Sequence, residues 1–491
     1  MTLRKTLLAG GLCLFSICLV SPARAEEESG RLPQDYLEMA ARIDQLLTER
    51  WQQEQVAPSP PASDAEFLRR TCLDLTGVVP TVALAREFLD GVRPDATESA
   101  TSVELHRRRL VDRLLSSPRY ASHMATVWRT RMLPEQFDPG QLPTAMGLER
   151  WLRQQFARNL RYDNLVADLV ASSGTRESGP ALYFTALELK PEKLAASTAR
   201  IFMGLQIQCA ECHNHPFDHW TQQDFWGYAA FFAQLEGAGD EQPFPRAVNV
   251  LRDSNRGEVT LPDQEDPVAP KFPAGQLSSQ ELGGTRRQQL AIWLASRDNP
   301  YLARAAVNWA WAHLFGRGLV DPVDDLGKHN PASHPQLMEE LAIYFERNGF
   351  DVQDLLRTLC STKAYQLSSR REGGEAPAEL YAQMAVKTLT AEQYYDSLAR
   401  CLTQAEAAEG PTGQAFDQRR VEFIVRMQTA ARSALEYENG PRQALQLMNG
   451  PLTGEATSIE QSALLGSLEA PFFTDRQRLE TLFLATLSRP P

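Results

Sequence analysis

The segment SDAEFLRRTCLDLTG, residues 63–77, contains the signals for both ends of one α-helix. Ser63 and Glu66 have the spacing of a capping box, in which each side chain accepts a hydrogen bond from the backbone N–H of the other residue. Gly77 provides the stop, because glycine readily adopts the left-handed conformation that ends many helices. A proline-rich break at residues 58–61 precedes the segment. The segment therefore predicts one complete helix.

Apolar residues recur at helical spacing along most of the remaining chain. This pattern predicts helices over residues 36–47, 82–90, 103–116, 119–132, 146–158, 162–172, 191–207, 221–235 and 287–314, the last stretch broken at Asn299-Pro300. Two further helices are expected to begin near Ser333 and Thr390, where polar residues suited to capping precede helical sequence. The chain is therefore predicted to be mainly α-helical.

A change of composition divides the chain into two parts. Glycines and prolines surround short alternating stretches at residues 247–251 and 258–261, which predict a small β-hairpin. We expect a mainly α fold in which two helical domains, residues 26–235 and 284–491, are joined by a linker at residues 236–283 that contains the hairpin.

The first 25 residues have the pattern of a secretory signal peptide. Arg4 and Lys5 provide the positive start, residues 7–20 the apolar stretch, and an Ala-Arg-Ala cleavage site ends at Ala25. The apolar stretch is too short to span a bilayer. We predict cleavage after Ala25, a periplasmic or secreted location, and no transmembrane anchor in the mature protein.

The composition excludes some classes of partner. The formal net charge is −12, and loss of Arg4, Lys5 and Arg24 with the signal peptide changes it to −15 (−12 − 3). So acidic a chain is unsuited to binding nucleic acid or anionic membrane surfaces. The mature chain keeps five cysteines, too few for a disulfide scaffold of this length; they are Cys72, Cys209, Cys212, Cys360 and Cys401.

The strongest chemical signal is a cluster of cysteines and histidines within residues 209–219, in a chain with only seven cysteines and eight histidines. Cys209, Cys212 and His213 form C-x-x-C-H, the attachment signature of c-type haem. On a helical turn these positions share one face, so both thiols can form thioethers to the porphyrin while the imidazole binds the iron. We predict haem c as the cofactor, with the two cysteines as anchors and His213 as axial ligand.

The same stretch allows a zinc interpretation. Cys209, Cys212, His215 and His219 also read C-x-x-C-x-x-H-x-x-x-H, a ligand set suited to tetrahedral zinc. The spacing between the second cysteine and His215 is tighter than in a zinc finger. Zinc is kept as the alternative cofactor, and the predicted metal-binding histidines are His213, His215 and His219.

A third interpretation is a Cys209–Cys212 disulfide beside histidines that only pack or cap a turn. Asp218 is placed to orient one imidazole, as metal-binding histidines often require. Aromatic residues nearby either wall a porphyrin or belong to an ordinary core; they are Phe217, Trp220, Phe225, Trp226, Tyr228, Phe231 and Phe232. A polar group in the second domain forms either a carboxylate–histidine site or turn and capping residues; it comprises His313, Arg317, Asp321, Asp324, Asp325, His329 and His334.

Several ordered motifs carry a resemblance to known domains. In the first half they are residues 68–80, 110–120 and 206–232; in the second half they are residues 299–301, 307–309, 314–320, 333–335, 447–451 and 487–491. With these motifs, the chain resembles a pair of exported bacterial domains, the planctomycete cytochrome-like domain and the planctomycete-specific domain that follows it. The resemblance implies a cytochrome-like role for the C-x-x-C-H motif, with extracellular polysaccharide or sulfated-glycan breakdown as the setting.

These observations lead to one functional expectation and two alternatives. The expectation is an exported c-type haem protein that serves electron transfer or haem-assisted oxidation in the periplasm with an unidentified redox partner. One alternative is a structural or hydrolytic protein that holds zinc or another metal at the Cys/His cluster. The other is a non-catalytic component of an envelope or surface assembly. Whether the chain is an enzyme stays open.

Overall fold

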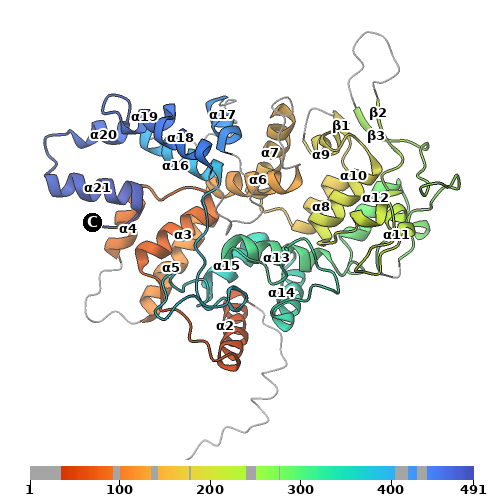
Figure 1. The fold of residues 1–491 in the computed structure, drawn as a ribbon, viewed down its shortest axis with the longest axis horizontal. Helices are drawn as coiled ribbons and strands as arrows, with labels where there is room; N and C mark the ends of the chain where they lie inside the picture. Colours follow the sequence, from red (N-terminus) through yellow and green to blue (C-terminus); the bar gives the residue numbers. More distant parts are fainter. Residues whose placement is uncertain are drawn as a thin grey trace, which may run out of the picture.

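The computed structural model describes residues 35–91, 100–133, 142–175, 179–238, 250–275, 277–403, 418–427 and 440–491. Within these ranges the chain is mainly helical, so the predicted fold class is confirmed (Figure 1). The predicted signal peptide lies outside the described residues. None of the helices in the ranges given above is long and apolar enough to cross a bilayer.

Most predicted helices are present. Those of the first half are α2 (Tyr36–Gln53), α3 (Asp64–Thr76), α4 (Val82–Gly91), α5 (Ala100–Leu115), α6 (Pro118–Met132), α7 (Leu142–Ala157), α8 (Tyr162–Val170), α9 (Ala181–Ala186), α10 (Pro191–Thr198) and α11 (Gln222–Ala229). The helices of the second half are α12 (Arg286–Leu294), α13 (Leu302–Phe315), α14 (Pro335–Arg347), α15 (Val352–Ser361), α16 (Ala391–Thr403), α17 (Gln418–Met427), α18 (Pro441–Asn449), α19 (Pro451–Thr457), α20 (Ala463–Leu468) and α21 (Asp475–Leu487), of which α15 and α17 to α21 were not predicted. Helix α9 was not predicted, because six residues are too few to display helical periodicity.

A small antiparallel sheet contains strands β1 (Gly174–Thr175), β2 (Leu235–Ala238) and β3 (Val250–Asp253) in the order β1-β3-β2. The predicted strand at residues 247–251 overlaps β3, but its hairpin partner is β2 and not residues 258–261. The helix predicted over residues 221–235 is also too long, since α11 ends at Ala229. This earlier helix end leaves Leu235 in an extended strand, where it lies opposite Asp253.

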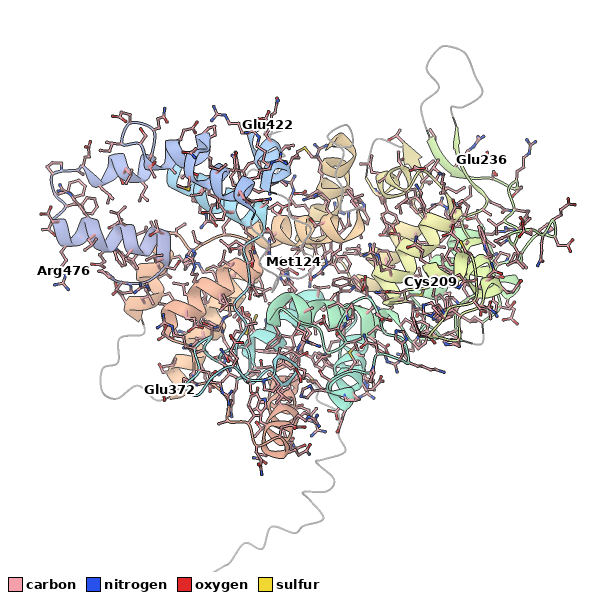
Figure 2. All side chains as sticks on the ribbon, in the orientation of Figure 1. Met124, Cys209, Glu236, Glu372, Glu422 and Arg476 are labelled. Carbon is pink, nitrogen blue, oxygen red and sulfur yellow. The ribbon has the colours of Figure 1, made fainter. Side chains whose placement is uncertain are left out.

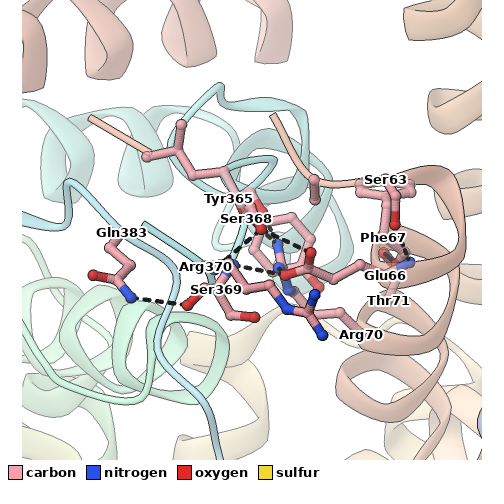
Figure 3. A network of polar contacts seen from close by, with 12 residues as sticks. Ser63, Glu66, Phe67, Arg70, Thr71, Tyr365, Ser368, Ser369, Arg370 and Gln383 are labelled. Atoms are coloured by element: carbon pink, nitrogen blue, oxygen red, sulfur yellow. Dashed lines mark hydrogen bonds and ion pairs between the residues drawn. The ribbon is translucent and has the colours of Figure 1, made fainter. Parts of the chain in front are cut away.

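Helix α3 begins and ends where predicted, but only half of its capping box forms. The Glu66 N–H donates to the Ser63 hydroxyl at 3.2 Å, and Gly77 ends the helix with φ of 72°. The Glu66 carboxylate instead accepts hydrogen bonds from the Ser369 N–H at 2.7 Å and the Ser368 hydroxyl at 3.0 Å (Figure 3). The prediction of a reciprocal box is therefore wrong, because Glu66 finds better donors 302 positions further along the chain.

The two halves of the chain share one buried core. Helix α12 packs on α8, and α15 packs on α2. Hydrogen bonds cross between the halves at the main chain as well, since the Ala62 N–H donates to the Gln366 carbonyl at 2.8 Å. The carboxy-terminal helix α21 lies beside α4 (Figure 1), where Arg86 donates to the Thr481 hydroxyl at 2.7 Å. Helices on both sides of residues 236–283 are therefore buried against one another.

A buried polar cluster lies between α3 and the second half. The Lys387 ammonium donates to Asp74 Oδ1 at 2.5 Å and to the carbonyls of His313 and Leu314 at 3.0 and 2.8 Å. The Tyr365 hydroxyl donates to Asp74 Oδ2 at 2.9 Å. Asp74 and Tyr365 are buried and the Lys387 side chain is only 15% exposed, so these groups depend on their partners in the protein. The sequence shows this cluster only as one acidic residue inside the apolar run of α3.

Two buried histidines beside this cluster predict a loss of stability in acid. The rings of His123 and His313 lie 5.6 Å apart, and burial lowers the pKa of each from 6.5 to about 3. Below pH 6.5 the unfolded chain therefore binds protons that the folded chain does not, so stability falls as the pH decreases from 6.5 toward 3. Each histidine contributes up to about 1.4 kcal/mol per pH unit in this window.

Urea unfolding measured at several values between about pH 7 and pH 5 tests this expectation. The His123→Gln variant is expected to lose about half of the dependence that the two histidines contribute, since glutamine binds no proton in either state. Asp74, Lys387 and Arg131 remain charged neighbours in both proteins and supply the common background. The same slope of stability against pH in both proteins would contradict the assignment.

Candidate functional site

The main chain enters the C-x-x-C-H motif from an irregular helix end. Helix α10 continues as the π-helical turn η2 (Ala199–Met203), which ends at Gly204 in the left-handed conformation with φ of 65°. The helix predicted through residue 207 therefore stops earlier. Leu205 and Ile207 are buried and anchor the chain just before the first cysteine. Single π-turns of this kind are frequent at functional sites.

The two cysteines lie on a short 3₁₀ turn, η3 (Gln208–Glu211), and on the residue that follows it. Cys209 lies within the turn, and Cys212 follows it three positions later with α-helical backbone angles. Ala210 between them is fully buried and holds the turn against the core, whereas both cysteines are exposed free thiols. Figure 2 labels Cys209 in the yellow-green part of the molecule that contains α10 and α11.

The axial-ligand candidate His213 is exposed, and its ring is oriented by its own loop. Its Nδ1 lies 2.8 Å from the Asn214 carbonyl, which fixes the proton on Nδ1 and leaves Nε2 as the basic nitrogen. Helix α11 holds this loop from the other side, because the Gln222 side chain donates to the Cys212 carbonyl at 2.6 Å. The start of α11 is the predicted one, with a reciprocal capping box from Thr221. Gln222 was not predicted, since a lone glutamine gives no signal.

His215 occupies a different position in the loop. Its Nδ1 accepts hydrogen bonds from the backbone N–H groups of Phe217 and Asp218 at 3.3 and 3.0 Å. The backbone N–H of His215 donates to the Trp220 carbonyl at 2.7 Å, which closes the loop on itself. The proton of this imidazole is therefore on Nε2. A metal ion at Nε2 would require moving that proton to Nδ1, where two N–H donors already point.

Asp218 joins the histidines of the loop. Its side chain is only 5% exposed, and Oδ1 accepts hydrogen bonds from the His219 N–H at 2.7 Å and from His219 Nδ1 at 2.6 Å. Burial raises the pKa of Asp218, but these bonds and the nearby imidazole of His329 outweigh it and hold the pKa below its usual value. The carboxylate thus orients His219, as predicted. The His219 ring also lies against Trp220, with centroids 4.3 Å apart.

The second half of the chain contributes a loop to this region, residues 321–330. Asp324 accepts a hydrogen bond from the Gln206 side chain at 3.0 Å and pairs with Arg200 at 3.4 Å. The Leu326 N–H donates to the Gly204 carbonyl at 2.7 Å. These contacts touch the chain immediately before the cysteines.

The structure does not bring the predicted polar group of the second half together at one site. Asp324, Asp325 and His329 reach the C-x-x-C-H region. His313 belongs to the buried cluster, where it donates to the Asp74 carbonyl at 2.7 Å. His334 is buried against the Tyr381 ring, and Arg317 pairs with Asp321 at 3.6 Å near the surface.

The aromatic residues near the motif belong mostly to the core. Phe225, Tyr228, Phe231 and Phe232 are fully buried, and Trp220 is nearly so. Trp226 is partly buried and donates to the Glu211 carbonyl at 3.1 Å, which supports the 3₁₀ turn. Phe217 differs from the others because it is 79% exposed beside the loop.

The geometry fits the anchors of a c-type haem better than a zinc site. Two exposed free thiols three positions apart and an imidazole with a basic Nε2 are the groups that thioether attachment and axial binding require. Zinc at Cys209, Cys212, His215 and His219 would disturb the hydrogen bonds of His215. In the part of the chain that the structure describes, no three His, Cys, Asp or Glu side chains converge around a common point suited to a metal ion.

The fold and the site define a mainly helical protein with an exposed loop of cysteines and histidines. Residues 42–237 match the family model PSCyt2, described as a protein of unknown function (DUF1549), and residues 286–436 match PSD1, described as a protein of unknown function (DUF1553). The chain belongs to the family that pairs these two domains in this order, which confirms the resemblance seen in the sequence. Comparison with curated proteins and with solved structures found no match.

Proposed function

We propose that this chain is an exported c-type haem protein that serves electron transfer or haem-assisted oxidation outside the cytoplasm. Cys209 and Cys212 would hold the porphyrin through thioethers, and His213 would bind the iron through Nε2. The observation that carries the proposal is the pair of free, exposed thiols three positions apart at a short turn, followed directly by an imidazole whose Nδ1 bonds the Asn214 carbonyl.

The chain's own residues would have three tasks in such a protein. The Asn214 carbonyl fixes the tautomer of His213 and raises its basicity, as outer hydrogen bonds do for metal-binding histidines. The buried Ala210 keeps the turn attached to the core. The bound haem would supply one-electron chemistry, and the surface position of the motif suits exchange with an external redox partner.

Replacement of Cys212 by alanine tests the proposal. The wild-type chain, expressed with its own leader in a host that matures c-type cytochromes, is expected to carry one covalent haem. Because the thioethers are covalent, its reduced α-band is expected to survive denaturation and its mass to increase by one haem. The Cys212→Ala protein is expected to lose double attachment, and a Cys209→Ala/Cys212→Ala protein is expected to lose covalent haem entirely.

The buried thiol provides a matched control for these variants. Cys360 is a free cysteine in the core, and its replacement by alanine removes one thiol without touching the motif. Haem content is expected to match wild type in that variant. A colourless wild-type protein with one tightly held zinc ion would replace the haem proposal by the metal alternative. A protein with neither haem nor metal would leave the non-catalytic assembly role.

A further inference from the structure

We propose that His329 of the second domain is a positioning residue for the C-x-x-C-H loop, acting through Asp218. The candidate site is then completed by both domains and not by the first alone. The consequence for haem binding rests on the function proposed above, whereas the positioning role itself does not. Three sets of contacts carry the inference.

The first set fixes the chain before the motif. Leu326 donates its N–H to the Gly204 carbonyl at 2.7 Å, and a Cβ at Gly204 would lie 2.6 Å from the Leu326 side chain. Asp324 accepts a hydrogen bond from Gln206 at 3.0 Å. Loop 321–330 thus contacts the chain within three residues of Cys209, at Gln206. Its contact at Gly204 is close enough to require a glycine there.

The second set fixes the chain after the motif. His329 Nε2 donates to Asp325 Oδ2 at 3.0 Å, so the imidazole is held by its own loop. Its other nitrogen lies 3.8 Å from Asp218 Oδ2, and its ring is stacked on His215 with centroids 6.2 Å apart. A Cβ at Gly327 would lie 2.5 Å from the His329 ring and 2.8 Å from Asp218 Oδ2, so a glycine leaves room for both groups.

The third set of contacts links Asp218 and His215 to the rest of residues 213–220. The Asp218 N–H donates to His215 Nδ1 at 3.0 Å, and Oδ1 holds His219. His215 in turn closes the loop onto Trp220. His329 therefore packs against both residues on which the shape of residues 213–220 depends, touching His215 by ring contact and approaching Asp218 Oδ2 to 3.8 Å. Removing its imidazole should loosen this loop without removing any group of the C-x-x-C-H motif.

Hydrogen exchange of the full-length protein before haem attachment tests the inference. In His329→Ala, amides in the peptide spanning residues 213–220 are expected to exchange about tenfold faster than in wild type, because the ring that packs on His215 and approaches Asp218 is lost. In His329→Gln, which keeps an N–H donor toward the carboxylates, exchange is expected to return close to wild type. Such rescue distinguishes positioning through Asp218 from filling of space.

A matched histidine provides the control. His106 makes one hydrogen bond, to the Phe88 carbonyl, and one ring contact, with Phe88, both far from the loop. His106→Ala is expected to leave exchange in residues 213–220 unchanged. Unchanged exchange in His329→Ala, or equal acceleration in His106→Ala, would overturn the inference.

The same variants separate this inference from the proposed function. If the wild-type protein carries no covalent haem, the proposed function fails while the exchange result still decides the positioning role. If haem is attached in wild type and His329→Ala shows no faster exchange, the positioning role fails alone. Asp325→Asn provides a second test, because it weakens the hydrogen bond that holds the His329 imidazole. Exchange at the wild-type rate in both His329→Ala and Asp325→Asn counts against the inference.

Discussion

Replacing Asp74 by asparagine is expected to lower the free energy of unfolding by about 3–5 kcal/mol, the cost of breaking a buried ion pair from one side. The Lys387 ammonium would keep its bonds to the His313 and Leu314 carbonyls but lose the only carboxylate it contacts in the described cluster, at 2.5 Å. Tyr365 would lose a charged acceptor, and its hydroxyl cannot ionise to compensate, since burial raises its pKa well above 10.

The pH dependence of the Asp74→Asn protein provides an independent check. Burial already lowers the pKa of Lys387, and loss of the Asp74 charge lowers it further. Between that pKa and 10.5, the value in the unfolded chain, the unfolded state binds more protons, so stability rises with pH. The deficit of the variant is therefore expected to shrink as the pH increases above neutral.

Two further proteins complete the test of the buried pair. Adding Lys387→Met to the Asp74→Asn variant should restore part of the lost stability, because no unpaired charge then remains in the core. Asp112→Asn breaks an exposed pair with Arg357, in which the Asp112 side chain is 51% exposed, and is expected to cost only about 0–1 kcal/mol. Chemical unfolding gives the free energy of unfolding of the wild type and of the three variants. Equal losses for Asp74→Asn and Asp112→Asn would exclude a special role for the buried pair.

Replacing Arg287 by alanine is expected to cost a similar amount, about 3–5 kcal/mol. Its side chain is 1% exposed and donates to Asp253 Oδ1 at 2.6 Å and to the carbonyls of Val170 and Ser172 at 3.0 and 2.7 Å. The guanidinium also lies over the Phe184 ring, 5.1 Å from its centroid. One residue of α12 thus connects the end of α8 with strand β3, and alanine would leave a carboxylate and two carbonyls without this donor.

The preceding residue is the matched control for Arg287. Arg286 makes two bonds to the Glu258 carboxylate, at 2.8 and 2.9 Å, but this pair is open to solvent at Glu258. Arg286→Ala is expected to lower stability by about 1 kcal/mol or less. Thermal unfolding of both variants compares a buried ion pair with one whose carboxylate is 41% exposed, one position apart. A loss below about 1.5 kcal/mol for Arg287→Ala would show that burial adds nothing to this ion pair.

Local signals account for what could be predicted of the fold. Gly77 ends α3 with a positive φ, Thr221 forms a reciprocal capping box at α11, and a matching pair of bonds links Thr390 and Gln393 before α16. Each of these signals operates within four residues, so it is readable from the chain alone. The strand partner of β3 was not readable in this way, because it depends on where α11 ends.

The candidate site was likewise only partly predictable from the sequence. Cys209, Cys212 and His213 were identified by their spacing, and the structure presents their side chains at the surface. The sequence marks His329 only as one member of a polar group far along the chain. Its approach to Asp218 requires loop 321–330 to fold over the first domain, which no periodicity or motif indicates.

The amino-acid sequence by itself determined the helical class, the ends of several helices and the position of the C-x-x-C-H motif, because period, capping and motif spacing are properties of neighbouring residues. Only the tertiary structure decided that Glu66 would leave its own helix end for Ser369, that Asp74 would face Lys387, and that the second domain would hold the loop after the cysteines. These pairs are separated by more than one hundred positions. Their partners are chosen by packing and by the need to satisfy buried charges.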